Sequence, residues 1–259
     1  MAGTGSGQIP PRSLPVARFG RPGRPAGFST RWKPILPALE KYFTVYAVDR
    51  RGRGESGDGS NYAIEREFDD VAAVVDPIGN GVDLLGHSFG AVCALEAGLR
   101  TSHLRKLILY EPPLALVGLS IYPEGIVDRL RAQLDSGDRR GVLTTFFHEV
   151  VRMPAHEFEL FQLSPAFPAR IAAAHTLPRE LRVHEAYQFK PERFKTLNVP
   201  TLLLLGGDSP SFSKAAIEAV NGALPNSRIV VLPGQQHIAM DTAPDLFVRE
   251  VLAFLAKPA

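Results

Sequence analysis

Hydrophobic and polar positions along the chain alternate between short apolar runs and longer amphipathic segments. The apolar runs have strand length, are rich in branched and aromatic side chains, and stand at 43–48, 82–86, 104–110, 201–206 and 227–232. Helical patterns separate most of them, with the clearest examples beginning at Tyr62 and Phe89. Strands that alternate with helices predict a mostly parallel sheet with helices on both faces, so the predicted fold class is α/β.

The alternation stops in the middle of the chain and resumes later. Between residues 115 and 195 the patterns are mostly helical, and none of them reads convincingly as a strand. A helical block inserted between two strands of a sheet predicts a lid over 115–195. The α/β core is then expected to comprise residues 28–114 and 196–259.

The first 27 residues differ in composition from the rest of the chain. They contain six Gly, five Pro and four Arg, and no period of 2 or 3.6 runs through them. Such a composition is typical of an irregular segment that buries little apolar surface. We therefore expect residues 1–27 to form an irregular, disordered arm.

Composition excludes several classes of protein. No apolar run approaches the roughly 18–20 residues of a membrane helix, and the first residues lack the apolar stretch of a signal peptide, so we expect a cytoplasmic location without membrane partners. The single cysteine, Cys93, allows no internal disulfide and no multi-cysteine metal site. The total charge is +2, but residues 1–39 hold six basic and no acidic residues, so the remaining chain is net −4. We expect no nucleic-acid partner, because no basic patch is indicated on the ordered part.

The segment "VDLLGHSFGAV" carries the strongest chemical signal. Its G-x-S-x-G motif places Ser88 between a buried strand and a helix, where Gly86 and Gly90 leave room for a sharp turn. The helix N-terminus brings unpaired N–H groups close to the serine oxygen. This placement predicts a nucleophilic serine, and it makes the neighbouring His87 a candidate for the wall of a substrate pocket.

A serine hydroxyl needs a base and a group that orients the base. Asp208 follows the strand at 201–206, and His237 lies just after the strand at 227–232, so both are expected at the carboxyl edge of the sheet beside Ser88. The order Ser…Asp…His predicts a catalytic triad of Ser88, Asp208 and His237. Glu111, which follows the strand at 104–110, is the alternative acid. The remaining histidines show no metal-ligand spacing, so no metal site is expected.

Several segments in order resemble those of the α/β-hydrolase superfamily over roughly residues 28–257. "VYAVDRRGRGESGDG" is similar to its D-x-R-G-x-G-x-S loop, "VDLLGHSFGA" to its nucleophile turn, and "PTLLLLGGD" and "GQQHIAMDTAPD" to its acid and histidine segments. The resemblance implies a hydrolase that cleaves a carboxylic ester or related acyl bond of a small molecule through an acyl-enzyme, without a cofactor. A C–C bond hydrolase or lyase on the same fold is the alternative within enzymes.

The oxyanion site departs from the superfamily's pattern. The resemblance implies one donor at the backbone N–H of Phe89 and a second in a loop after an apolar strand that ends in His-Gly. This chain has no His-Gly there, so Arg21 is the candidate for the second N–H, and the central slot of the sheet is expected to lack a good strand. Residues 1–27 also resemble a coding stretch read out of frame. A catalytically impaired, hydrolase-like binding protein therefore remains a further alternative.

Aromatic residues in the predicted lid are candidates for contacts with an apolar substrate group. The phenylalanines expected to serve in this way are Phe146, Phe147, Phe158 and Phe161.

Overall fold

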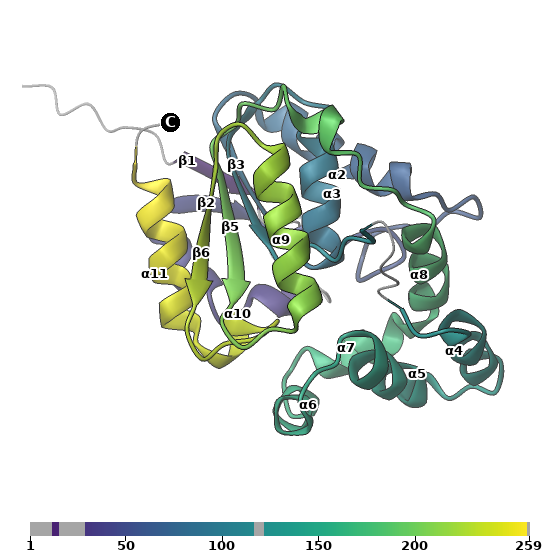
Figure 1. Cartoon of the computed structure of the whole chain (residues 1–259). Coiled ribbons are helices and arrows are strands. Elements are labelled where there is room, and N and C mark those ends of the chain that lie inside the picture. Colours follow the sequence, from purple (N-terminus) through teal and green to yellow (C-terminus); the bar gives the residue numbers. More distant parts are fainter. Residues whose placement is uncertain (1–11, 16–28, 117–121, 258–259) are drawn as a thin grey trace, which may run out of the picture.

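Four parallel strands form the main sheet of the protein (Figure 1). In this computed structural model, which describes residues 12–15, 29–116 and 122–257, the strand order is β3-β4-β5-β6. Their bounds are Val82–His87 for β3, Leu104–Tyr110 for β4, Thr201–Gly206 for β5 and Ser227–Leu232 for β6. Because all four run parallel, their carboxyl ends meet at one edge of the sheet. The α/β fold class predicted from the sequence is confirmed.

Successive residues of the central strands face opposite sides of this sheet. Ile108 and Tyr110 of β4 belong to one apolar cluster, and Leu107 and Leu109 to the other. This alternation follows from the two-residue period of a strand, and fully buried runs are what a parallel sheet covered on both faces requires. The edge strand β6 is only partly covered, and Val231 is 51% exposed.

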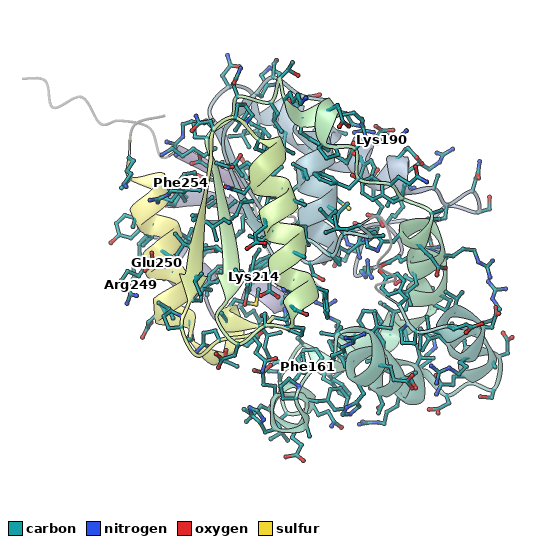
Figure 2. All side chains as sticks on the ribbon, viewed as in Figure 1. Phe161, Lys190, Lys214, Arg249, Glu250 and Phe254 are labelled. Carbon is teal, nitrogen blue, oxygen red and sulfur yellow. The ribbon has the colours of Figure 1, made fainter. Side chains whose placement is uncertain are left out.

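Helices cover both faces of the sheet (Figure 1). One face packs against α2, α3 and α9, and the other against α1 and α11. Charged side chains lie on the outer surfaces of these helices, including Lys214 on α9 and Arg249 on α11 (Figure 2). The bounds are Leu36–Leu39 for α1, Ile64–Ile78 for α2, Phe89–Ala97 for α3, Ser211–Ala223 for α9, Ala239–Thr242 for α10 and Pro244–Leu255 for α11.

Two further strands extend the architecture on the β3 side. β1, Arg12–Pro15, pairs in parallel with β2, Phe43–Tyr46, and also lies against β3. β1 therefore occupies the central position of the sheet, between β2 and β3, for which no good strand could be predicted from the sequence. The prediction of an irregular arm is wrong for residues 12–15, because backbone pairing with β2 holds a segment whose side-chain pattern gives no strand signal. The rest of that predicted arm, residues 1–11 and 16–27, lies outside the described residues.

A group of helices between β4 and β5 stands apart from the sheet, over the carboxyl ends of its strands (Figure 1). We call residues 122–194 the helical insertion. Its helices are α4 (Ile126–Asp135), α5 (Arg139–Thr145), α6 (Ala155–Gln162), α7 (Phe167–Ala172) and α8 (Leu177–Glu185), with a π-helical turn at Phe146–Val150 and 3₁₀ turns at Ala174–Thr176 and Pro191–Phe194. That the insertion opens and closes as a lid stays a prediction.

Candidate active site

Ser88 lies on the sharp turn between β3 and α3. Its backbone has φ 55° and ψ −131°, a conformation that a residue other than glycine rarely adopts. The Ser88 N–H donates to the carbonyl of Tyr110 on β4 at 2.9 Å, which fixes the turn to the neighbouring strand. A Cβ on Gly86 would lie 2.5 Å from the carbonyl oxygen of Gly90, so the turn requires glycine at position 86. The geometry holds the serine side chain at the end of the strand.

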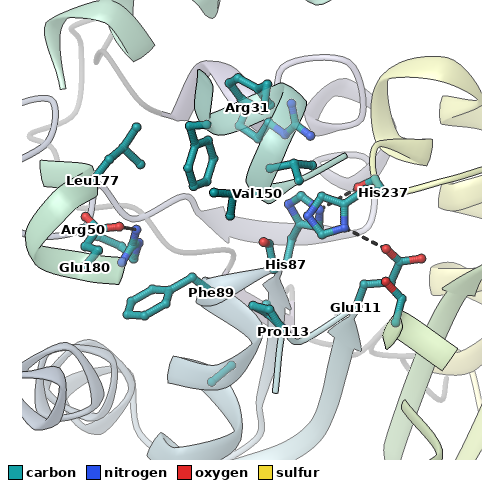
Figure 3. A pocket seen from close by; sticks show the side chains of 18 of the residues that line it. Arg31, Arg50, His87, Phe89, Glu111, Pro113, Val150, Leu177, Glu180 and His237 are labelled. Carbon is teal, nitrogen blue, oxygen red and sulfur yellow. Dashed lines mark hydrogen bonds and ion pairs between the residues drawn. The ribbon is translucent and has the colours of Figure 1, made fainter. Parts of the chain in front are cut away.

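His237 is paired with Glu111 by a hydrogen bond. The distance from His237 Nδ1 to Glu111 Oε2 is 2.7 Å, and the Glu111 side chain is almost completely buried (Figure 3). Glu111 also accepts hydrogen bonds from the Gly206 N–H at 2.8 Å and from the Ser209 hydroxyl. Burial by itself raises the pKa of Glu111, but the bonds from His237, Ser209 and Gly206 lower it overall. The carboxyl group is therefore held as an anion against the histidine.

This pairing corrects the preferred acid of the sequence analysis. Asp208 was expected to orient His237, but its side chain is exposed and only its backbone N–H contacts the histidine loop, at the carbonyl of Gln235, 2.9 Å away. The physical reason is the turn after β5, which directs residue 208 to solvent. The position beside the imidazole is filled from β4, where Glu111 adopts φ 44°.

Two side chains fix the loop that carries His237. The His87 Nε2 atom lies 2.7 Å from the backbone oxygen of His237, which makes it the donor of that bond (Figure 3). The Tyr110 hydroxyl donates to the carbonyl of Gln236 and accepts the Ala239 N–H. Burial, and next the proximity of His237, lower the pKa of His87, so it is held as a neutral ring. His87 thus lines the cavity, as predicted, and in addition supports the histidine loop.

Ser88, Glu111 and His237 line one cavity of about 230 Å³ between the sheet edge and the helical insertion. Phe146 and Phe147 also line it, in agreement with their predicted positions. Phe158 and Phe161 were predicted to lie there as well. Both are instead buried inside the insertion, where they pack against Phe147 and Phe167, so the structure does not bring them to the cavity wall.

Of the two predicted oxyanion donors, Phe89 lies within the described residues and Arg21 does not. The Phe89 N–H stands at the first position of α3, where backbone N–H groups have no carbonyl partner within the helix. The Phe89 ring lies beneath the Arg50 guanidinium, 4.6 Å from its centroid, and this contact fixes the start of the helix. Arg21 lies outside the described residues. So do residues 16–28, which follow β1 and correspond to the segment from which the second donor was expected.

Charged side chains that the sequence analysis did not place in the site form part of the cavity wall. They are Arg31, Arg50, Arg53, Glu157, Arg170 and Glu180. Arg50 and Arg53 could have been suspected, because they stand directly after β2 in the glycine-rich loop at the same edge of the sheet. The others come from the helical insertion or from the 3₁₀ turn at 29–32, and nothing in their local sequence indicates that they meet at this cavity.

Arg50 and Arg53 join the core to the helical insertion through Glu180 on α8. The distances are 2.9 Å from Arg50 Nη2 and 2.6 Å from Arg53 Nη2 to Glu180 Oε2, and Arg50 also contacts Glu67 at 3.0 Å. Burial raises the pKa of Glu180, but the two guanidinium groups outweigh burial and lower that pKa to about 2. The carboxylate is therefore ionised at neutral pH. Figure 3 shows the Arg50–Glu180 contact beside Phe89.

The described residues contain neither a metal-binding cluster nor a membrane-spanning helix. Within the described ranges, no three or more His, Cys, Asp or Glu side chains are grouped so as to hold a metal ion. In the same part of the chain, no helix has the length and apolar character to cross a membrane.

A strained serine at a strand–helix turn and a buried carboxylate–histidine pair on the same sheet edge define a hydrolase-type site. The family model described as "Alpha/beta hydrolase family" matches residues 20–250. The chain belongs to the alpha/beta hydrolase family, and it is an enzyme of that kind.

Comparison with individual proteins agrees with this assignment. The crystal structure of an alpha/beta hydrolase from Sphaerobacter thermophilus has a TM-score of 0.78 and 33% identity, with 95% of this chain and 93% of that chain covered. A 2-(acetamidomethylene)succinate hydrolase from Mesorhizobium japonicum is 23% identical over 88% of this chain and 84% of its own length. An N-formylmaleamate deformylase from Pseudomonas putida is 25% identical over 80% of this chain and 76% of its own length.

Proposed function

We propose that the protein hydrolyses a carboxylic ester or a related acyl bond, such as an amide, through a covalent acyl-enzyme formed on Ser88. The observation that carries the proposal is the buried Glu111–His237 pair, which shares one cavity with a serine in a strained backbone conformation. A base that is itself oriented by a carboxylate is the arrangement that activates a serine hydroxyl.

The steps follow from these three residues. Ser88 Oγ attacks the acyl carbon, and its proton passes to Nε2 of His237 while Glu111 holds Nδ1–H and stabilises the imidazolium. The Phe89 N–H stabilises the developing oxyanion. The leaving group departs with the proton from His237. A water molecule then attacks the acyl carbon, His237 takes its proton, and the carboxylic acid is released as Ser88 is protonated again.

The relatives support this reaction class. The name of the Mesorhizobium japonicum protein describes hydrolysis of an acetamido compound, and the name of the Pseudomonas putida protein describes removal of a formyl group. In both compounds an acyl group is bonded to nitrogen. Both names also denote compounds derived from four-carbon dicarboxylic acids. An esterase on a methyl ester is a further match. Amide and ester cleavage share the acyl-enzyme route, so both belong to the proposal.

The test is a comparison of turnover and covalent labelling. Wild-type protein is expected to hydrolyse a p-nitrophenyl ester and to react with a fluorophosphonate at Ser88, and Ser88→Ala should lose both. His237→Ala should lower turnover about as much as Ser88→Ala does, because the two residues act as a unit. Ser136→Ala, on the exposed end of α4, is the matched control and should retain both. Full activity of the Ser88 or His237 variant would refute the assignment.

A C–C bond hydrolase is the second candidate. It is favoured by the match to a 2-hydroxy-6-oxo-2,4-heptadienoate hydrolase, which is 25% identical over 87% of this chain. The acyl hydrolase and the C–C bond hydrolase are distinguished by the substrates that the protein turns over. Turnover of a vinylogous diketone without turnover of esters or amides would favour C–C cleavage. Ligand binding without labelling at Ser88 would favour the impaired, binding-only alternative.

A further inference from the structure

Guanidinium groups from separate parts of the chain converge on the cavity that holds Ser88. Arg31 comes from the 3₁₀ turn at 29–32, Arg50 and Arg53 from the loop after β2, and Arg170 from α7 of the helical insertion. These residues are far apart in the sequence, and they meet because the insertion lies over the carboxyl edge of the sheet. The cavity wall therefore holds four guanidinium groups close to the nucleophile, together with the carboxyl groups of Glu111, Glu157 and Glu180.

Arg31, Arg50 and Arg53 are fixed by carboxylates of the protein. Arg50 and Arg53 contact Glu180, as described above, and Arg31 lies 3.1 Å from Asp241. The Arg31 and Arg53 side chains are only 7% and 6% exposed. Their positions are set by the fold, and the neighbouring carboxylates offset much of their positive charge.

Arg170 differs in position, because it stands on the insertion side of the cavity and is only partly buried. Loss of hydration lowers the pKa of Arg170 strongly, and the proximity of Arg31, Arg53 and Arg50 lowers it further, while Asp241 acts in the opposite direction. Burial and His237 are the main causes of the lowered pKa of His87, the neighbour of Ser88, and Arg31 and Arg170 lower it further. Charges that repel one another in a poorly hydrated cavity are stabilised when an anion enters.

Besides Arg170 and Glu180, the insertion places Glu157 on α6 at the cavity. Its side chain is buried, and within the described residues its Oε2 atom accepts no hydrogen bond. Burial raises the pKa of Glu157, which favours its neutral form over a second fixed anion near His237. Glu157 therefore opposes anion binding less than an ionised carboxylate would.

We propose that Arg170 binds a carboxylate group of the substrate, so that this hydrolase acts on esters or amides that also carry a free carboxylate. The inference deepens the proposed function and rests on it. A planar guanidinium accommodates a carboxylate through two parallel hydrogen bonds. Apolar side chains make up much of the remaining wall and suit the hydrocarbon between the carboxylate and the scissile bond; they include Trp32, Phe146, Phe147, Val150, Leu177 and Leu181.

Two esters of equal chain length test the proposal. Mono-p-nitrophenyl adipate carries a terminal carboxylate, and p-nitrophenyl hexanoate carries a methyl group in the same place. Wild-type protein is expected to show a higher kcat/KM for the adipate ester. In Arg170→Met the ratio of the two kcat/KM values should fall by about 10-fold to 100-fold, mainly through KM of the adipate ester, because a hydrogen bond to a charged group contributes about 1.5–3 kcal/mol.

Arg182→Met is the matched control, since Arg182 is an exposed arginine on α8 and its replacement removes the same charge. The ratio should stay at the wild-type value in this variant. Arg170→Lys, which keeps the charge but loses the planar group, should give an intermediate ratio. If Arg170→Met does not fold, the test uses Arg170→Lys instead. The stabilisation of wild-type and Arg170→Lys proteins by free adipate is then measured as a thermal shift, and a smaller shift in Arg170→Lys supports the proposal.

The outcomes separate the two proposals. Turnover of neither ester and no fluorophosphonate labelling would count against the proposed function itself. Turnover of both esters with no wild-type preference for the adipate ester, or an equal loss of preference in the Arg182 and Arg170 variants, would overturn the carboxylate site alone. An adipate thermal shift that is the same in wild-type and Arg170→Lys proteins would overturn it as well.

Discussion

Replacement of Glu111 by glutamine distinguishes the carboxylate that the structure pairs with His237 from the one that follows β5. Glu111→Gln keeps the shape of the side chain but removes its charge. The new amide can donate to Nδ1 of His237, and a ring that accepts at Nδ1 carries its proton on Nε2, where it cannot take the proton of Ser88. The perturbation therefore acts on the tautomer of the base as well as on its charge.

The magnitude follows from the contact. Glu111 Oε2 lies 2.7 Å from His237 Nδ1, and Glu111 is 2% exposed, so water cannot replace the lost anion. A hydrogen bond to a charged group contributes about 1.5–3 kcal/mol, which corresponds to a factor of about 10 to 100 in rate. The same carboxylate-to-amide change in the serine-protease triad lowers kcat about 10⁴-fold because the tautomer is wrong. We expect a loss in kcat between about 10² and 10⁴, with little change in KM.

Asp208→Asn is the matched control, because it makes the same chemical change at an exposed carboxylate. Surface substitutions usually change free energies by less than about 0.5 kcal/mol, so kcat should remain within about twofold of wild type. The assay is steady-state hydrolysis of a p-nitrophenyl ester, with thermal midpoints recorded to show that both variants are folded. A larger loss of kcat in Asp208→Asn than in Glu111→Gln would refute the reasoning and return the acid role to Asp208.

Three further predictions concern stability and reactivity. Gly86→Ala should lower the free energy of unfolding by about 1–3 kcal/mol or more, because the new Cβ would lie 2.5 Å from a backbone oxygen. Gly90→Ala is the control: its Cβ would have nothing within 4 Å, so it should change the free energy of unfolding little. Equal effects of the two substitutions in urea denaturation would contradict the clash. The pKa of Glu180 is lowered from 4.5 to about 2, so the ionised carboxylate stabilises the fold fully above pH 4.5, and this stabilisation is lost as the pH falls toward 2. Glu180→Gln should therefore lower the free energy of unfolding by on the order of 3 kcal/mol at pH 7. A difference from wild type that persists at pH 2 would refute this. Burial raises the pKa of the Cys93 thiol, so a thiol reagent should label Cys93 only on unfolding, and labelling at a matching rate in the native protein would contradict its burial.

The sequence was sufficient for the features that depend on local pattern. The central strands and the helix after Ser88 follow from buried apolar runs and from the glycines of the turn, so the α/β class and the place of the serine could be predicted. Within the insertion, the third helix, α6, follows from the helical pattern that begins at Ala155. The fifth helix, α8, has a weaker local signal, because its sequence "LPRELRVHE" is mostly polar and the helix is stabilised by ion pairs with the core.

The features that depend on tertiary register could not be read from the sequence. Glu111 and Asp208 both follow buried strands at one edge of the sheet, and only the three-dimensional course of the two turns decides which carboxylate reaches His237. Arg170 and Arg31 are separated by more than half of the chain, and no local pattern brings them to one cavity. β1 is a similar case, since the position between β2 and β3, rather than its side chains, makes "RSLP" a strand.

The ion pairs between α8 and the loop after β2 have a consequence for how the cavity can open. Besides the contacts of Glu180 with Arg50 and Arg53, Arg179 on α8 lies 2.8 Å from Asp58 in the same loop. Separation of the buried pairs would leave charges without partners, which is strongly unfavourable. We therefore expect the insertion to remain attached to the core at its α8 end, and we expect substrate to reach Ser88 from the opposite end, near α6.

Contacts at the α6 end are of a weaker kind. There the insertion contacts the core through Arg31 against the Phe161 ring, and through Arg152 against the Phe212 ring, at 5.6 and 5.2 Å from the ring centroids. Amide hydrogen exchange should be faster in α6 than in α8, and the reverse order would exclude this attachment. We therefore expect the loop after β2 to determine the direction from which substrate enters, although none of its own charges is required to take part in bond cleavage.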